Sequence, residues 1–200
     1  MQATIPMTGM VLGRVTRAPG PGLAWKLSNL ANLWHGWWRH WVACRLGVGH
    51  FYGTLHALLT RADGTVINYG LISTRVITDV GVAFLVDDWD NNTTDFTDMN
   101  YHACGTGVGA EGVAEEALGA EATTITDRGT GAKTQPAANQ LRSVGTQAFT
   151  DVGVITEHGI FSDVAESAGV LWDRSMFAAI NVANGDSIAW TYTCTVSAGG

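Results

Sequence analysis

Acidic residues at alternate positions mark the segment whose spacing most resembles a metal-binding motif. Asp88, Asp90 and Asn92 are arranged like the first oxygen ligands of an EF-hand calcium loop. The match then ends, because Thr93 stands where the loop requires Gly and Met99 stands where it requires a bidentate Glu. The segment is predicted to be a solvated acidic loop without a cofactor, and a weaker, irregular calcium site is the alternative.

A second set of possible metal ligands contains soft donors. His102 and Cys104 are two residues apart on an expected strand, so their side chains would share one face. A metal could bridge them if His158 or Cys194 came near, but two ligands do not make a site. Buried positions with satisfied hydrogen bonds are the preferred interpretation. The three cysteines, Cys44 included, lack a CxxC spacing, which indicates free thiols.

Two adjacent pairs have the residue types of acid/base catalysis. Glu157 precedes His158, and Asp173 precedes Arg174. Neighbouring residues of a strand point to opposite faces, so neither pair could act together on one substrate. The chain also contains no GxSxG, HExxH, Walker-type or GxGxxG pattern. These observations predict a protein that is not an enzyme.

The segment 23–46 is rich in tryptophan and has the period of a helix face. Its apolar residues recur at spacings of four and three, at Leu23, Leu27, Leu30, Trp34, Trp37, Trp41 and Cys44. Trp and Arg are the residues most enriched at interface hot spots. The candidate interface residues are Trp25, Leu30, Trp34, Trp37, Trp38, Arg39 and Trp41. Contact with another subunit is favoured over packing on the chain's own sheet, and over a membrane or nucleic acid.

Charge is scarce and unevenly distributed along the 200 residues. Charged residues make up 14% of the chain, against about 25% in typical soluble proteins. Residues 1–62 contain six basic residues and no acid, whereas the rest contains all 18 acids and five bases. The low charge indicates extensive contact with other subunits, and the acidic body of a neighbouring copy would serve as partner for the basic segment. No signal peptide or membrane span is predicted.

The chain divides into three parts. Residues 1–22, punctuated by Gly and Pro, are predicted to form an extended arm, and residues 23–46 an amphipathic Trp-rich helix. Residues 47–200 are expected to form a β-sandwich or jelly-roll-like domain. Asp63 followed by Gly64 predicts a tight turn that joins two strands into a hairpin.

Within that domain the expected elements follow the changes of period along the chain. Strands are predicted at 51–61, 65–73, 99–104, 122–130, 139–150, 153–162, 169–178 and 187–197. Residues 77–89 are a helix or a buried strand, with the helix preferred, and residues 105–122 form a surface excursion. Large apolar residues alternate with small or polar ones from 187 to 197, which is typical of a strand with one buried face. This strand is expected to be an edge of the domain with its polar face toward a neighbour.

The second half of the chain resembles a group of small β-sandwich virion proteins of tailed bacteriophages. The residues that carry the resemblance are Gly105, Thr106 and Gly107; Asn139 to Arg142; Ile155 to Phe161; Leu171 to Phe177; and Ile180 to Ile188 with the closing strand. It covers residues 99–200, and the order and spacing of these short signatures are more informative than any one of them. The basic segment 1–50 lies outside it.

The resemblance implies a non-enzymatic structural protein of the phage particle. The expected function is a capsid decoration or cement protein that is assembled in the host cytoplasm and located in the virion. Its N-terminal arm would bind the major capsid protein and neighbouring copies. The chain is expected to form a homo-oligomer, for which a trimer is one arrangement, and to have no nucleic acid or membrane partner. The alternative is a tail, collar or fibre subunit with a host-glycan-binding role, for which Trp89 or Trp172 on a concave face would be evidence.

Overall fold

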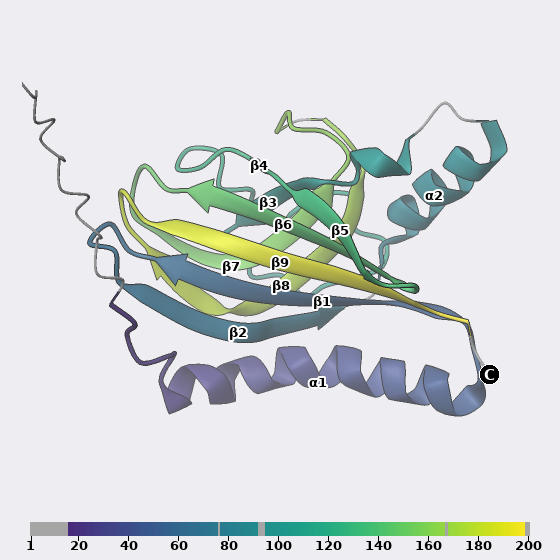
Figure 1. Cartoon of the computed structure of the whole chain (residues 1–200), viewed down its shortest axis with the longest axis horizontal. Helices are drawn as coiled ribbons and strands as arrows, with labels where there is room; N and C mark the ends of the chain where they lie inside the picture. The colour runs from purple at the N-terminus through teal and green to yellow at the C-terminus, as the bar shows by residue number, and fades with distance from the viewer. Residues whose placement is uncertain (1–15, 76, 92–94, 167, 199–200) are drawn as a thin grey trace, which may run out of the picture.

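The chain folds into a mainly β body with two antiparallel sheets (Figure 1). The computed structural model describes residues 16–75, 77–91, 95–166 and 168–198, so most of the predicted arm lies outside the described residues. The elements in chain order are α1 (Leu23–Leu46), β1 (His50–Thr60), β2 (Val66–Arg75), α2 (Asp79–Asn91), the 3-10 helix η1 (Phe96–Asp98), β3 (Tyr101–Gly105), β4 (Gly129–Thr130), β5 (Ala132–Ala137), β6 (Gln140–Ala148), β7 (Gly153–Phe161), β8 (Leu171–Val182) and β9 (Ser187–Ser197).

The two sheets share one hydrophobic core. The first has the strand order β2-β1-β9-β6-β5, and the second has the order β4-β3-β7-β8. A single cluster of buried side chains draws on both sheets, with Leu55 and Trp190 from the first and Ile155 and Trp172 from the second. The prediction of a mainly β fold is confirmed.

The closing strand β9 has the predicted bounds but not the predicted place. Its apolar residues Ile188, Trp190, Tyr192 and Cys194 are at most 4% exposed, as the alternation indicates. The expectation of an edge strand is wrong, because β9 lies between β1 and β6 and forms a ladder with each. Two neighbouring strands satisfy its backbone groups, so β9 offers no free edge to another subunit.

The other expected elements divide into matches and misses. The hairpin is present as β1 and β2, and Gly64 of its turn has a φ of 82°. The strand predicted at 122–130 is wrong for most of its length, because the carbonyl of Ala122 accepts from the amides of Ile125 and Thr126 and closes a turn. The strand β5 was not predicted, since its residues are all exposed and show no alternation.

Helix α1 covers the side of the body at which the edge strands β2 and β8 approach each other (Figure 1). Just before it, Arg17 forms a parallel bridge with Val66 at the start of β2. The helix ends at Leu46 and is capped by Gly47, whose left-handed φ of 64° lets the amide of Val48 bond back to the carbonyl of Ala43 at 3.0 Å. The chain then reverses directly into β1, which fixes α1 against the first sheet.

Candidate interaction surface

The inner face of α1 docks on the sheet edges through polar side chains. Asn29 is buried, and its amide donates to the carbonyl of Ile72 on β2 at 2.7 Å while its oxygen accepts from the amide of Ala178 on β8 at 2.8 Å. The indole N–H of Trp25 lies 2.9 Å from the carbonyl of Ala179. These side chains satisfy backbone groups that an edge strand would otherwise leave unpaired.

Gly36 allows the middle of α1 to approach β2 closely. A Cβ atom at this position would lie 2.0 Å from the carbonyl oxygen of Thr74. The hydroxyl of Thr74 in turn donates to the carbonyl of Leu33 on the helix at 2.9 Å. The backbones of the helix and of β2 are therefore in contact at Gly36 and Thr74, and a residue larger than glycine at position 36 would prevent this contact.

Except for Trp25, the apolar residues predicted to face a partner lie on the opposite side of α1. The inner-face residues Trp25, Asn29 and Gly36 follow Leu23, Leu27 and Trp34 by two positions each. Two positions are about 200° of rotation on a helix with 3.6 residues per turn. The apolar side chains are 38–72% exposed, and we call them the outer seam: Leu23, Leu27, Leu30, Trp34, Trp37, Trp38 and Trp41. The chain thus packs the face that contains Asn29 on its own sheets and leaves the apolar outer seam exposed.

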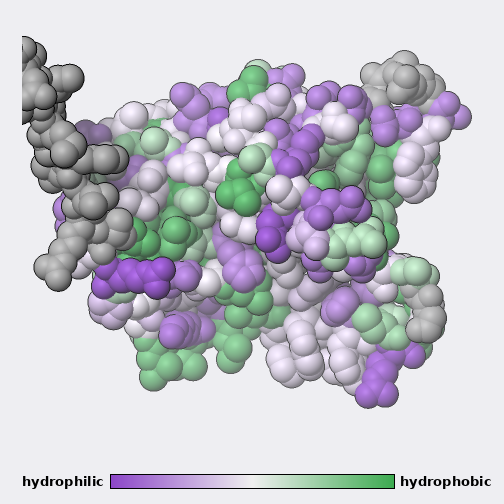
Figure 2. Space-filling view, in the orientation of Figure 1, coloured by the Kyte–Doolittle hydropathy of each residue, from purple (hydrophilic) through white to green (hydrophobic). Residues whose placement is uncertain are grey.

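The aromatic residues of the outer seam form mutual contacts. The rings of Trp34 and Trp37 are 5.3 Å apart, those of Trp38 and Trp41 are stacked at 5.0 Å, and the Arg45 guanidinium lies over Trp41 at 5.2 Å. Figure 2 shows hydrophobic and near-neutral residues, with few hydrophilic ones, along the lower edge of the molecule where α1 runs in Figure 1. Such a surface is typical of a contact with another macromolecule.

The predicted interface residues therefore separate into two groups. Leu30, Trp34, Trp37, Trp38 and Trp41 belong to the outer seam, whereas Trp25 is half-buried against Tyr69 with its rings 5.0 Å apart. Arg39 is exposed and lines a pocket beside the helix. The sequence pattern alone could not assign Trp25 to the inner face, because its indole bonds to residues more than 150 positions away.

A cluster of three possible metal ligands lies at the C-terminal end of α1. His40, Cys44 and His50 bring their ligand atoms within 4.8 Å of one another, and they are the one such group among the described residues. Burial, and then the proximity of His50, lowers the pKa of His40. Sequence reasoning missed the cluster, although the HxxxC spacing of His40 and Cys44 on a predicted helix is a detectable signal.

The other predicted metal ligands are distributed differently. His102 and His158 meet in the core at 3.0 Å between Nδ1 and Nε2, and Ser143 lies 2.8 Å from Nε2 of His102. Among the described residues, Cys104 and Cys194 do not complete a group of three ligands with them. Burial raises the pKa of the Cys194 thiol to about 12, and that of Cys104 is raised as well. Both thiols are therefore protonated at neutral pH.

Within each adjacent acid/base pair, the two side chains point to opposite faces of the sheet. Glu157 of one pair, however, forms an ion pair with Arg174 of the other. A carboxylate oxygen of Glu157 lies 2.7 Å from the Arg174 guanidinium. The amides of Gly107, Gly119 and Ala120 donate to the same carboxylate. Burial raises the pKa of Glu157, but the bonds from the amides of Ala120 and Gly119, together with Arg174, lower that pKa overall. The Glu157 carboxylate therefore holds residues 105–122 against the sheet, and its oxygens already accept the hydrogen bonds that they can form.

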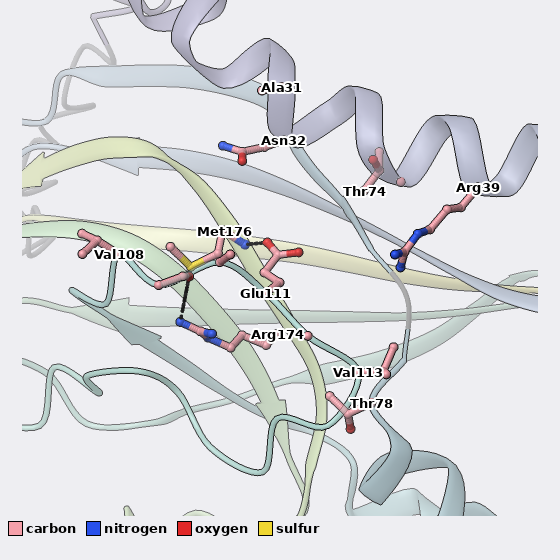
Figure 3. Close-up of a pocket in the computed structure, with 14 residues that line it drawn as sticks. Ala31, Asn32, Arg39, Thr74, Thr78, Val108, Glu111, Val113, Arg174 and Met176 are labelled. Carbon is pink, nitrogen blue, oxygen red and sulfur yellow. Dashed lines mark hydrogen bonds between the residues drawn. The ribbon is translucent and has the colours of Figure 1, made fainter.

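A pocket of about 540 Å³ separates α1 from the loop that contains residues 108–113 (Figure 3). Arg39 enters it from the helix, while Glu111 and Arg174 each contact Met176 of β8. Arg174 is already paired with Glu157 and with Glu115, the latter at 3.1 Å. Among the lining residues no Ser, Cys or His stands ready as a nucleophile or base.

The acidic loop and the glycan-binding tryptophans are not placed as expected. Asp88 and Asp90 lie in α2, so the predicted loop is wrong at these positions, and residues two apart on a helix do not share a face. Asn92 lies outside the described residues. Trp172 is 2% exposed in the core and cannot contact a sugar, and Trp89 is on a helix rather than on a concave sheet.

Comparisons with known proteins identify no significant match for this chain. No protein-family model matches it, and no curated protein or solved structure shows a significant match. Among the described residues, no helix combines the length and the hydropathy that crossing a bilayer would require. The outer seam therefore has to be interpreted from its own chemistry.

Proposed function

We propose that this protein is a non-enzymatic structural subunit that joins a larger particle through the outer seam of α1. The observation that carries the proposal is that α1 packs on the sheets through one face and leaves its apolar face exposed. Its inner face is held by the buried Asn29, and all seven outer-seam residues are exposed. Each Leu or Trp that a partner covers would contribute roughly 1.5–3 kcal/mol, less the cost of association.

The particle that we propose is a tailed-phage virion, with this chain as a capsid decoration or cement protein. The sequence resemblance over residues 99–200 supports that setting, and the outer seam supplies a surface for the major capsid protein and neighbouring copies. The body would be a jelly-roll-like β-sandwich, which is supported by its two antiparallel sheets and by the pairing of its first strand with its last. A tail, collar or fibre subunit is the alternative within this class.

The proposal is tested by removing the outer seam without touching the inner face. In the variant Leu27→Ser, Leu30→Ser, Trp34→Ser, Trp37→Ser every altered side chain is exposed. We expect the folded wild-type chain to co-purify with particles, and the folded variant to remain in the soluble fraction. Quantitative mass spectrometry of purified particles measures both amounts, and hundreds of copies per particle distinguish decoration from a tail component.

A matched control removes exposed apolar side chains elsewhere. Val152 directly precedes β7, Val154 is the second residue of that strand, and both are also exposed. The double variant Val152→Ser, Val154→Ser is expected to enter particles like the wild type. Incorporation of the outer-seam variant at the wild-type copy number would refute the proposal.

A further inference from the structure

We infer that His40, Cys44 and His50 form a zinc site that fastens the C-terminal end of α1 to the first sheet. The inference stands on this cluster alone and does not require the proposed assembly function. His40 and Cys44 are one helical turn apart and face the same side of α1. The reversal at Gly47 brings His50, the first residue of β1, beside them.

The contacts around the cluster prepare His50 for coordination and hold the His40 ring in place. Nδ1 of His50 lies 2.9 Å from the carbonyl oxygen of Val48, so this nitrogen carries the proton and Nε2 presents a lone pair. Nε2 of His50 in turn lies 2.7 Å from Nδ1 of His40. The His40 ring is stacked on Tyr52 with 4.1 Å between ring centroids, which fixes its orientation. Carbonyl partners of this kind typically support histidine ligands of zinc.

The distances are close to those of tetrahedral zinc. Bonds of about 2.0 Å to nitrogen and about 2.3 Å to sulfur would place two nitrogens about 3.3 Å apart and nitrogen and sulfur about 3.5 Å apart. The observed separations are 2.7 Å between Nδ1 of His40 and Nε2 of His50, 3.9 Å between Nδ1 of His40 and the Cys44 sulfur, and no more than 4.8 Å between His50 and that sulfur. Small side-chain rotations would therefore admit the ion.

Metal binding would exchange two protons' positions for three bonds to the ion. Zn²⁺ forms bonds to Nδ1 of His40, to Nε2 of His50 and to the Cys44 sulfur, and water takes the fourth position. The proton on Nδ1 of His40 moves to Nε2 of the same ring, and the thiol releases its proton to solvent. Cys44 is in the last turn of α1, where the negative end of the helix dipole favours a cation.

Thiol protection tests the site, because Cys44 is exposed while Cys104 and Cys194 are buried. In the folded, metal-free protein, we expect a thiol reagent such as DTNB to modify one cysteine. Stoichiometric Zn²⁺ is expected to slow this reaction at least about tenfold, because the thiolate that attacks the reagent is then bound to the metal. Co²⁺ in place of zinc should give tetrahedral absorption bands and a thiolate charge-transfer band with 1:1 stoichiometry.

Variants separate coordination from simple packing. His50→Gln retains the reactive thiol and should lose the protection by zinc, whereas His56→Gln, an exposed histidine on the same strand, should retain it. Cys44→Ser alters an exposed residue and should abolish the cobalt charge-transfer band even if His50→Gln fails to fold. Absence of 1:1 cobalt binding by the wild type, or equal zinc protection of a folded His50→Gln variant, would overturn the inference.

Discussion

At the residue scale, buried polar groups in this chain are paired across long stretches of sequence. Asn29 links both edge strands to α1, and the carboxylate of Asp186 accepts from Arg61 and from the amide of Ala62. Among the described residues, Nδ1 of His158 is one of two buried side-chain polar atoms without a hydrogen-bond partner. Such a group costs roughly 1–3 kcal/mol. The stability of the fold is therefore expected to depend on the protonation of the buried pair His102 and His158.

Mild acid is expected to destabilise the fold through this pair. Burial lowers the pKa of His102 to about 3, and burial followed by the proximity of His102 lowers the pKa of His158. Above about pH 6.5, the ordinary value, both imidazoles are neutral in either state and contribute no pH dependence. Below it the unfolded chain alone takes up protons, so stability falls by up to about 1.4 kcal/mol per pH unit for each histidine.

Urea unfolding at several pH values between about 7 and 5 measures this slope, in a range where most carboxylates remain ionised in both states. The variant His102→Gln should lose the contribution of one proton, about 1.4 kcal/mol per pH unit, whatever its overall stability. A slope identical to that of the wild type would show that His102 does not carry the effect.

At the element scale, local periodicity predicted strands and helices well but not how they pack. The alternation from 187 to 197 gave the bounds of β9, and Asp63 with Gly64 gave the hairpin, because period and turn chemistry are local. The central position of β9 follows from pairing with distant strands, which no local pattern records. The strand β5 was missed since it is exposed on both faces.

The orientation of α1 also depends on contacts with distant strands, which no local pattern records. Apolar periodicity identified the outer seam but implied nothing about which side the chain itself would cover. That choice depends on unpaired backbone groups of β2 and β8, which Asn29 satisfies, and on the space that Gly36 leaves at Thr74. The zinc cluster likewise depends on a chain reversal that brings a strand residue beside a helix.

The close contact at Gly36 gives a test of this packing. Gly36→Ala would gain about 1 kcal/mol in helix propensity, but its Cβ would overlap the backbone of Thr74. We expect a net loss of about 1–3 kcal/mol in the free energy of unfolding, because α1 has to move away from β2.

The matched variant is Gly22→Ser at the N-cap of the same helix. A Cβ at Gly22 meets no atom within 4 Å, and a serine hydroxyl there can accept from the first free amides of the helix. We expect this variant to be as stable as the wild type or slightly more stable. Urea unfolding compares the three proteins, and a Gly36→Ala variant at least as stable as the wild type would contradict the described contact.

At the scale of the whole molecule, basic and acidic residues lie in different parts of the chain. Helix α1 contains Lys26, Arg39 and Arg45 and no acid, whereas all 18 acids follow residue 62. Neighbouring copies could therefore meet in two ways, through the apolar outer seam or through the basic helix on an acidic body. The outer seam itself is uncharged, Arg39 lines the pocket, and Arg45 lies over Trp41. These positions favour the apolar contact.

Ionic strength distinguishes the two contacts. We expect sedimentation velocity to show concentration-dependent oligomers, with a dissociation constant that changes by less than about threefold between about 0.05 and 0.5 M NaCl, because screening acts on charges and not on apolar burial. The folded variant Trp34→Ser, Trp37→Ser should sediment as a monomer at both salt concentrations, since it lacks two aromatic rings of the outer seam. Oligomers that dissociate at high salt and persist in this variant would assign the contact to the charges, and a wild-type chain that stays monomeric would exclude association of free copies through the outer seam.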